Sequence, residues 1–159
     1  SALTGHLVFS TLHTNDAAGA ITRLADLGVE PYLISSSVNT VIAQRLVRVL
    51  CSRCREEHEI GPSHIKSLNG RGDEYIGRTA YQAKGCAKCF NTGYLGREAI
   101  FEIMIMDDKM KSLVLETSDA NQIREQALAA GMKTLRQDGM SKVLKGITSI
   151  DEVLRVTQE

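Results

Sequence analysis

The stretch "GCAKCFNTGYLGREAIFEI" (residues 85–103) joins a turn with paired cysteines to an apolar run. Cys86 and Cys89 are separated by two residues, and Gly93 and Gly96 allow the chain to turn tightly beside them. The apolar residues of "AIFEIMI" (99–105) then predict a buried strand. We therefore expect a small turn, held by its cysteines, directly before a strand that belongs to a larger core.

A second cysteine pair precedes this stretch. "CSRC" places Cys51 and Cys54 at the same spacing, and no secretion signal is visible that would favour disulfides. Four thiolates in two such pairs match a tetrahedral zinc site. Because four cysteines leave no open position for water, the predicted zinc is structural. The alternative is a set of free or redox-active thiols.

The segments on either side of the cysteine region predict an α/β layered core. Residues 55–78 are polar and rich in glycine, so we expect the cysteines to hold a segment that builds no core of its own. The patterns before it predict a buried strand at residues 6–12, followed by a helix at 17–27 that Asp16 caps. They then predict a second helix at 31–42, with Val41 and Ile42 in its apolar stripe, and a short strand at 45–50.

The last third of the chain predicts four helices. Asp107 or Asp108 can cap the first and Ser118 the second, which is expected to end at Gly131. The third is expected over about residues 133–145. The last begins at "SIDE", where Ser149 and Glu152 have the spacing of a capping box.

Composition excludes some classes of function. The 159 residues carry 19 basic and 19 acidic side chains, so the net charge of zero gives no basis for nucleic-acid binding by the whole domain. No apolar run approaches the roughly 18 residues that a membrane-spanning helix needs. Because the sequence begins at Ser1 inside a patterned segment, we interpret it as a piece of a longer protein.

The loop "STLHTNDA" (residues 10–17) follows the first predicted strand. Ligands of open α/β sheets bind beyond the carboxyl ends of the strands, which places Ser10, His13, Thr14 and Asn15 at the ligand edge. A histidine there can donate to a phosphate oxygen or orient a water molecule. The alternative is a histidine that only fastens its own loop.

Several stretches resemble one family. "TGHLVFSTLHTNDA" (4–17) is similar to the histidine box of the secretion and pilus traffic ATPases, which are RecA-like hexameric motors of type II secretion and type IV pilus assembly. The similarity continues through "IAQRLVRVLCSRC" (42–54), the stretch 85–103 and "KVLKGITSIDEVLRVT" (142–157). It covers nearly the whole chain, and the last of these stretches resembles the type II secretion members more closely.

This resemblance implies a fold and a division of the chain. Residues 1–50 would be the C-terminal part of a RecA-like ATPase core, and residues 51–97 a tetracysteine zinc-binding subdomain. Residues 98–159 would be the returning strand and a helical C-terminal region. The expected fold class is therefore α/β with a small tetracysteine zinc-binding insert.

The resemblance also implies roles for individual residues. His13 would lie near the γ-phosphate and report hydrolysis, and His6 would support its loop. Arg23 and Arg97 match arginines of the nucleotide site or the subunit interface, although surface salt bridges are the alternative for both. Cys51, Cys54, Cys86 and Cys89 match the metal ligands.

The same resemblance implies a cellular setting. The full-length protein would bind Mg-ATP, form a homohexamer in the cytoplasm and associate peripherally with inner-membrane platform proteins of the secretion system. Type IV pilus assembly is the alternative within this family.

One motif is missing, since no G-x-x-x-x-G-K-[ST] phosphate loop occurs in these residues. We therefore expect the stretch alone to be inactive as an ATPase. The alternative from a different class is a non-enzymatic, zinc-stabilised module that binds protein or nucleic acid.

Overall fold

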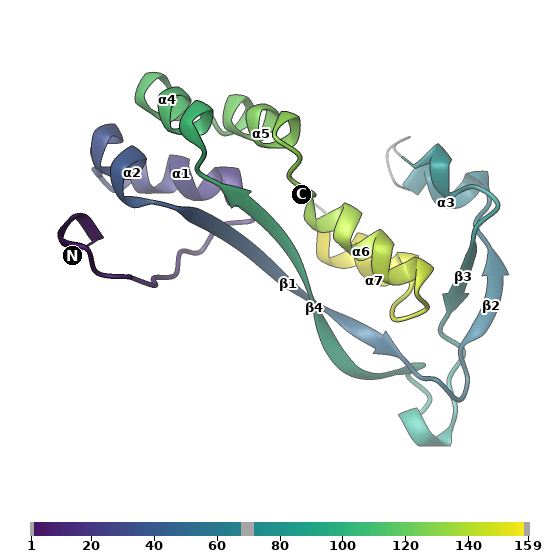
Figure 1. The fold of residues 1–159 in the computed structure, drawn as a ribbon. Coiled ribbons are helices and arrows are strands. Elements are labelled where there is room, and N and C mark those ends of the chain that lie inside the picture. The colour runs from purple at the N-terminus through teal and green to yellow at the C-terminus, as the bar shows by residue number, and fades with distance from the viewer. Residues whose placement is uncertain (1, 68–71, 158–159) are drawn as a thin grey trace. The chain divides into compact units, whose positions relative to one another are not determined.

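A computed structural model describes residues 2–67 and 72–157 and divides the chain into two compact units (Figure 1). The first unit comprises the chain up to Gln44 together with Phe101–Thr134. The second comprises Arg45–Ile100 together with the chain from Leu135 onward. Helices and strands both occur in the chain, which fits the predicted α/β class. Within the described ranges, no helix is long and apolar enough to cross a membrane.

Two long strands, β1 (Thr40–Leu50) and β4 (Tyr94–Ile105), pair with each other and contribute residues to both units. Figure 1 draws their arrows in opposite directions, so the pair is antiparallel. β4 contains the predicted strand 99–105 and extends it toward the cysteines. β1 begins five residues before the predicted strand 45–50, because the run from Thr40 to Ile42 is β-branched and adopts the extended conformation.

The second predicted helix is therefore shorter than expected. α2 (Pro31–Ser37) begins at the predicted proline, but it ends before Val41 and Ile42, which lie in β1. Ile34 is its buried apolar side chain. The prediction that Val41 and Ile42 belong to the helical stripe was wrong, because the β-branched run favoured the strand over the helical spacing.

The first unit packs four helices against its portion of the two strands. Besides α2 these are α1 (Ala17–Asp26), α4 (Asp108–Glu116) and α5 (Ala120–Ala129). Its core is a single apolar cluster that draws on all four helices and on β4, with the residues Ala17, Ala18, Ile21, Ile34, Met104, Met106, Met110, Val114, Ile123 and Ala127. Three of these ten side chains are methionines, whose flexible thioethers fill irregular gaps in such a core.

The helix caps decide where the helices of this unit begin. Asp16 caps α1 by accepting a hydrogen bond from the amide of Gly19 at 2.7 Å, and Asp107 caps α4 in the same way, as predicted. The predicted cap at Ser118 was wrong by one residue. Asp119 instead accepts from the amide of Asn121 at 2.7 Å, and a carboxylate is an equally good cap.

The predicted buried strand at residues 6–12 is absent. Residues 6–14 form neither helix nor strand, after a short 3-10 turn η1 (Ala2–Thr4), and Leu7, Val8 and Phe9 are exposed. A strand that is buried on both faces needs neighbouring strands and covering helices. Among the described residues, β1 pairs only with β4 and the two other strands pair only with each other, so no strand pairs with this segment.

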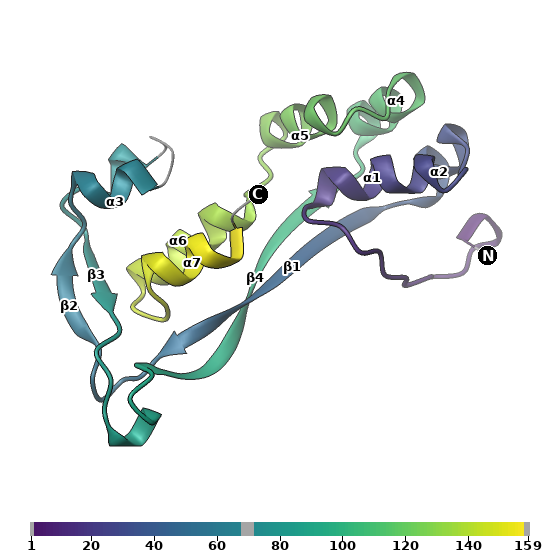
Figure 2. The ribbon, with the colours of Figure 1, turned by 180° about the vertical axis from the view of Figure 1, so that it is seen from behind.

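The second unit contains a small hairpin and two helices that lie side by side. β2 (Glu56–Glu59) pairs antiparallel with β3 (Thr79–Gln82). Figure 2 shows α6 (Leu135–Leu144) and α7 (Ile150–Thr157) in contact. The remaining elements of this unit are α3 (Pro62–Ser67), η2 (Asp73–Tyr75) and η3 (Ala87–Cys89).

The polar segment after the first cysteine pair builds no core of its own, as predicted, but its residue Ile60 is buried in a core that α6 and α7 largely provide. Ile60 follows β2 and Ala80 lies in β3, and both are buried in one cluster with Met140, Val143, Ile150 and Val153 of α6 and α7. These two buried side chains are enough to attach the hairpin to the core, because α6 and α7 supply the rest of the apolar surface. The cysteines are therefore not the only attachment of this segment.

Glu152 at the start of α7 has a different role from the one predicted. Its amide donates to Ser149 Oγ at 3.3 Å, which is one half of the predicted capping box. Its side chain is fully buried and instead accepts from Arg48 on β1 and from Arg155 one turn along the helix, at 2.7–3.0 Å. Glu152 therefore joins α7 to β1 within this unit.

Candidate metal centre and histidine loop

The structure brings the four cysteines together at one end of the second unit. Cys51 follows the last residue of β1, and a tight turn places Cys54 beside it, with the amide of Cys54 donating to the carbonyl of Cys51 at 3.2 Å. Cys86 directly precedes the short helical turn η3, and Cys89 is the last residue of that turn. None of the four forms a disulfide, and three of them are buried.

The distances between the sulfur atoms fit a tetrahedral metal. All four Sγ atoms lie within 4.8 Å of one another. Cys51 and Cys86 are 3.9 Å apart, and Cys89 lies 3.8 Å from both Cys54 and Cys86. A zinc ion with bonds of about 2.3 Å to four sulfurs separates those sulfurs by about 3.8 Å. The donor set therefore fits zinc in a closed coordination sphere.

Backbone donors point at this cluster and stabilise negative charge on sulfur. The amides of Cys86 and Gly93 donate to Cys89 Sγ at 3.2 and 3.3 Å. Burial acts to raise the pKa of the Cys89 thiol, but these two donors, together with hydrogen bonds from the side chains of Cys86 and Cys54, outweigh it and lower the pKa to about 6. Burial raises the pKa of the Cys54 thiol to about 12. Metal binding at this cluster therefore displaces protons and is expected to weaken as the pH falls.

Two glycines make room for the second cysteine turn. Gly93 has φ of 76°, and a Cβ there would lie 2.5 Å from Cβ of Ala83. Gly85 has φ of 110°, and a Cβ there would lie 2.8 Å from the carbonyl oxygen of Asn91. The predicted role of Gly93 as a turn residue is thus supported by its backbone conformation.

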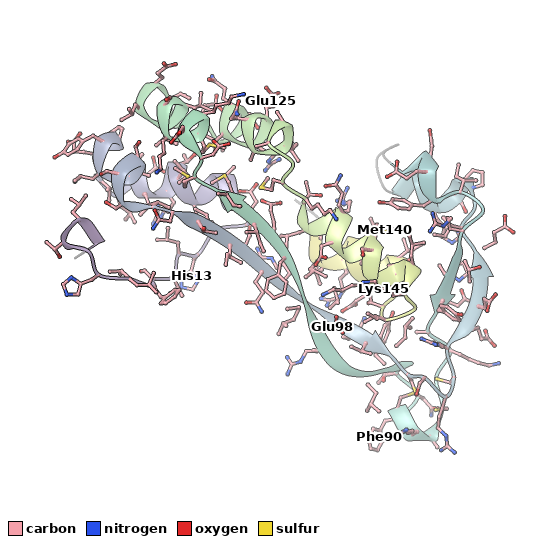
Figure 3. The ribbon with its side chains drawn as sticks, in the orientation of Figure 1. His13, Phe90, Glu98, Glu125, Met140 and Lys145 are labelled. Atoms are coloured by element: carbon pink, nitrogen blue, oxygen red, sulfur yellow. The ribbon has the colours of Figure 1, made fainter. Side chains whose placement is uncertain are left out.

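The histidines predicted from the opening loop lie on the exposed segment that precedes α1, and Figure 3 labels His13 there. His6 Nδ1 lies 3.0 Å from Thr4 Oγ1. The side chain of His13 has no hydrogen-bond partner within residues 2–67 and 72–157. His13 therefore does not fasten its own loop in this structure.

The two predicted arginines are exposed and belong to different units. Arg23 lies on α1 in the first unit. Arg97 lies on β4 in the second, beside an open hollow that is also lined by Arg48 and Tyr94. Neither guanidinium forms an ion pair with a described residue, so the alternative of a surface salt bridge is not realised for either of them.

The sequence reasoning missed two charged residues that fix the junction of the histidine loop and α1. Glu102 on β4 is buried, and its Oε1 accepts from the amide of Ala17 at 2.9 Å. Arg124 on α5 forms an ion pair with the capping carboxylate of Asp16. An acid inside the apolar run "AIFEIMI" was the visible signal for Glu102. Nothing in the sequence pattern around Arg124 singles it out.

The sequence is similar to proteins of bacterial secretion and pilus systems. The profile of the family described as Type II/IV secretion system protein matches residues 1–155. All 159 residues align at 47% identity with the type IV pilus assembly ATPase PilB of Thermus thermophilus and cover 18% of that protein.

Two further relatives are named for type II secretion. The chain is 47% identical to the type II secretion system protein E of Pseudomonas aeruginosa and 46% identical to the type II secretion system ATPase E of Vibrio cholerae. All 159 residues align in both cases and cover 31% of each relative. The chain thus spans 18–31% of the length of these three proteins.

Proposed function

Because this chain belongs to the type II/IV secretion system protein family, we propose that the protein containing it hydrolyses ATP to power type II protein secretion through assembly of a pseudopilus. The observation that carries the proposal is the unbroken alignment of all 159 residues, at 46–47% identity, with relatives that include two named ATPases. The substrate is Mg-ATP, bound by the full-length protein. These residues contain no phosphate loop of the type G-x-x-x-x-G-K-[ST], so the stretch alone is inactive.

The proposed fold of the whole protein is a RecA-like core, to which residues 1–50 contribute the histidine box. Residues 6–14 support this proposal because they expose Leu7, Val8 and Phe9 on a segment that forms neither helix nor strand. Such a segment is suited to pair as an inner strand once neighbouring strands are supplied. Residues 51–97 then form the zinc subdomain and residues 98–159 the returning strand and helical region.

In this site His13 contacts the γ-phosphate of ATP and senses its loss, and His6 supports the loop from its amino-terminal side. A neutral imidazole donates a hydrogen bond to a phosphate oxygen, and a nearby anion favours the charged form, which binds phosphate more strongly. The free imidazole of His13 supports this role. Arg23 and Arg97 supply cations to a nucleotide site or a subunit interface, where phosphoryl transfer develops negative charge.

The proposed metal is one structural zinc held by Cys51, Cys54, Cys86 and Cys89. Zinc supplies a closed four-thiolate clamp that ties the end of β1 to the turn around η3. Four sulfurs complete the coordination sphere, so no position is left for a reacting water molecule. The sulfur–sulfur distances of 3.8–3.9 Å support this assignment.

The active form in this proposal is a homohexamer in the cytoplasm that associates peripherally with platform proteins of the inner membrane. Nucleic acid is not a proposed partner, because the net charge is zero. Type IV pilus assembly is the second candidate function. It is favoured by one specific observation, the 47% identity to a pilus assembly ATPase, which equals that to a type II secretion protein.

An ATPase assay on the purified full-length protein tests the enzymatic proposal. We expect Mg-ATP hydrolysis in the wild type and its loss in His13→Ala. Tyr32→Ala is a matched control, because Tyr32 is an exposed ring of the same unit outside the histidine loop. Normal turnover by His13→Ala would contradict the sensor role. Absence of hydrolysis by the wild type would favour the non-enzymatic, zinc-stabilised binding module.

A further inference from the structure

The junction between the histidine loop and α1 is fixed more firmly than a helix start requires. Asp16 caps α1 through Oδ1, which accepts from the amide of Gly19 at 2.7 Å. A single side-chain acceptor of this kind is enough for an ordinary cap. Here the second carboxylate oxygen of Asp16 also forms an ion pair with Arg124, and that pair is largely buried, with 33% and 18% of the two side chains exposed.

Gly19 keeps the space that this arrangement needs. A Cβ at position 19 would lie 2.8 Å from Oδ1 of Asp16 and 3.9 Å from Asp16 Cγ. Alanine would otherwise be the better residue here, since glycine inside a helix is less favourable than alanine. Gly19 therefore leaves room for the Asp16 carboxylate at the cost of some helix stability.

Glu102 adds a second carboxylate from a different element. It lies in β4 and is 5% exposed, and its Oε1 accepts from the amide of Ala17 at 2.9 Å. Burying a carboxylate is unfavourable unless donors compensate it, and the amide of Ala17 is one such donor for Glu102. The first turn of α1 is thus held by a strand through Glu102 and by a helix, α5, through Arg124.

We infer that Arg124 and Glu102 are positioning residues for His13, acting through Asp16 and the first turn of α1. Asp16 follows His13 by three positions, so their Cα atoms lie at most about 11 Å apart, however the loop moves. Fixing Asp16 therefore confines the imidazole to a small region. The inference rests on the proposed function insofar as His13 acts on a nucleotide.

The test uses the full-length protein and two kinds of measurement. Hydrogen exchange reports on the amides of the first turn of α1, and steady-state kinetics report kcat and KM for Mg-ATP. Arg124→Gln and Asp16→Asn are both expected to speed exchange there about tenfold and to lower kcat by about 10- to 100-fold, with KM changed by less than about threefold. Arg124→Lys keeps the charge and is expected to recover most of kcat.

Two more variants separate positioning from simple support of the fold. Gly19→Ala gains helix propensity while displacing the Asp16 carboxylate, so we expect an unchanged or raised melting temperature together with a lower kcat. The double variant Asp16→Asn with Arg124→Gln is expected to be no slower than either single variant, because the two side chains act as one unit. Lys84→Gln is the control, since it removes an exposed ion pair with Glu56 in the other unit.

The outcomes distinguish this inference from the proposed function. Unchanged exchange and unchanged kcat in Arg124→Gln would overturn the inference while leaving an active ATPase in place. Faster exchange in Arg124→Gln would support the structural part of the inference even if the wild type hydrolyses no ATP. The lack of hydrolysis by the wild type would overturn the proposed function. If Gly19→Ala lowers kcat only in proportion to a fall in melting temperature, Arg124 and Glu102 support the fold and do not position His13.

Discussion

The buried carboxylate of Glu152 gives a prediction whose size follows from its surroundings. Desolvation acts to raise the pKa of Glu152, but hydrogen bonds from Arg155 and Arg48 outweigh it and lower the pKa from 4.5 to about 2. That difference corresponds to about 3 kcal/mol of stability at neutral pH. The two arginine side chains are 46% and 56% exposed, so screening by solvent reduces the expected value to about 2 kcal/mol.

The perturbation is Glu152→Gln, which keeps the shape of the side chain and removes its charge. The amide turns an NH2 group toward guanidinium donors, so part of the hydrogen bonding is lost as well. We expect the α7 amides of the full-length protein to exchange about 30-fold faster at pH 7, which is the ratio for about 2 kcal/mol. Glu56→Gln removes an exposed pair and is expected to change exchange by less than about fivefold.

The contribution of Glu152 to stability depends on pH in a predictable direction. A carboxylate whose pKa is lowered by folding stabilises the native state above pH 4.5, and that contribution is lost as the pH falls from 4.5 toward 2. The difference in stability between the wild type and Glu152→Gln is therefore expected to shrink as the pH falls from 4.5 toward 2. Equal exchange in the two proteins at pH 7, or a difference that is the same at pH 7 and pH 3, would refute the reasoning.

Three further predictions concern packing, the metal and the histidine loop. Gly139→Ala is expected to destabilise the protein by about 1–3 kcal/mol in thermal unfolding, because the new Cβ would lie 2.6 Å from Val153 Cγ1. Gly61→Ala is the control, because its Cβ would meet no atom within 4 Å among the described residues beyond its chain neighbours. Elemental analysis is expected to find one zinc per chain in the wild type and less in Cys86→Ser, and equal zinc content in both proteins would contradict the assigned ligands. Competition with a chelator is expected to show weaker zinc binding as the pH falls. His13→Ala is expected to abolish ATP turnover by the full-length protein without a change in melting temperature, since no described residue holds this imidazole by a hydrogen bond.

Local patterns in the sequence predicted most of the helices and the cysteine cluster. The caps Asp16 and Asp107 begin their helices through contacts within a few residues, which a single sequence reveals. The two cysteine pairs were sufficient to predict one cluster, because two pairs of cysteines at this spacing are typical of a metal site.

Contacts between distant residues were beyond the reach of the sequence. Whether residues 6–12 form a strand depends on neighbours, and a strand-like composition cannot supply them. The ion pair of Asp16 with Arg124 joins residues 108 positions apart, and the hydrogen bond from Ala17 to Glu102 spans 85 positions. No local period signals either contact. The half-formed capping box has the same cause, because Arg48, which is 104 positions away, takes the carboxylate of Glu152.

Complementation of a deletion strain tests the central claim most directly. In the organism that carries this gene, deletion followed by expression of the wild type or of His13→Ala allows type II exoprotein secretion and surface pili to be measured in the same cells. We predict that secretion is lost on deletion, restored by the wild type and not by His13→Ala, while pili are unaffected. Normal secretion together with loss of pili in the deletion strain would contradict the claim and assign the protein to pilus assembly.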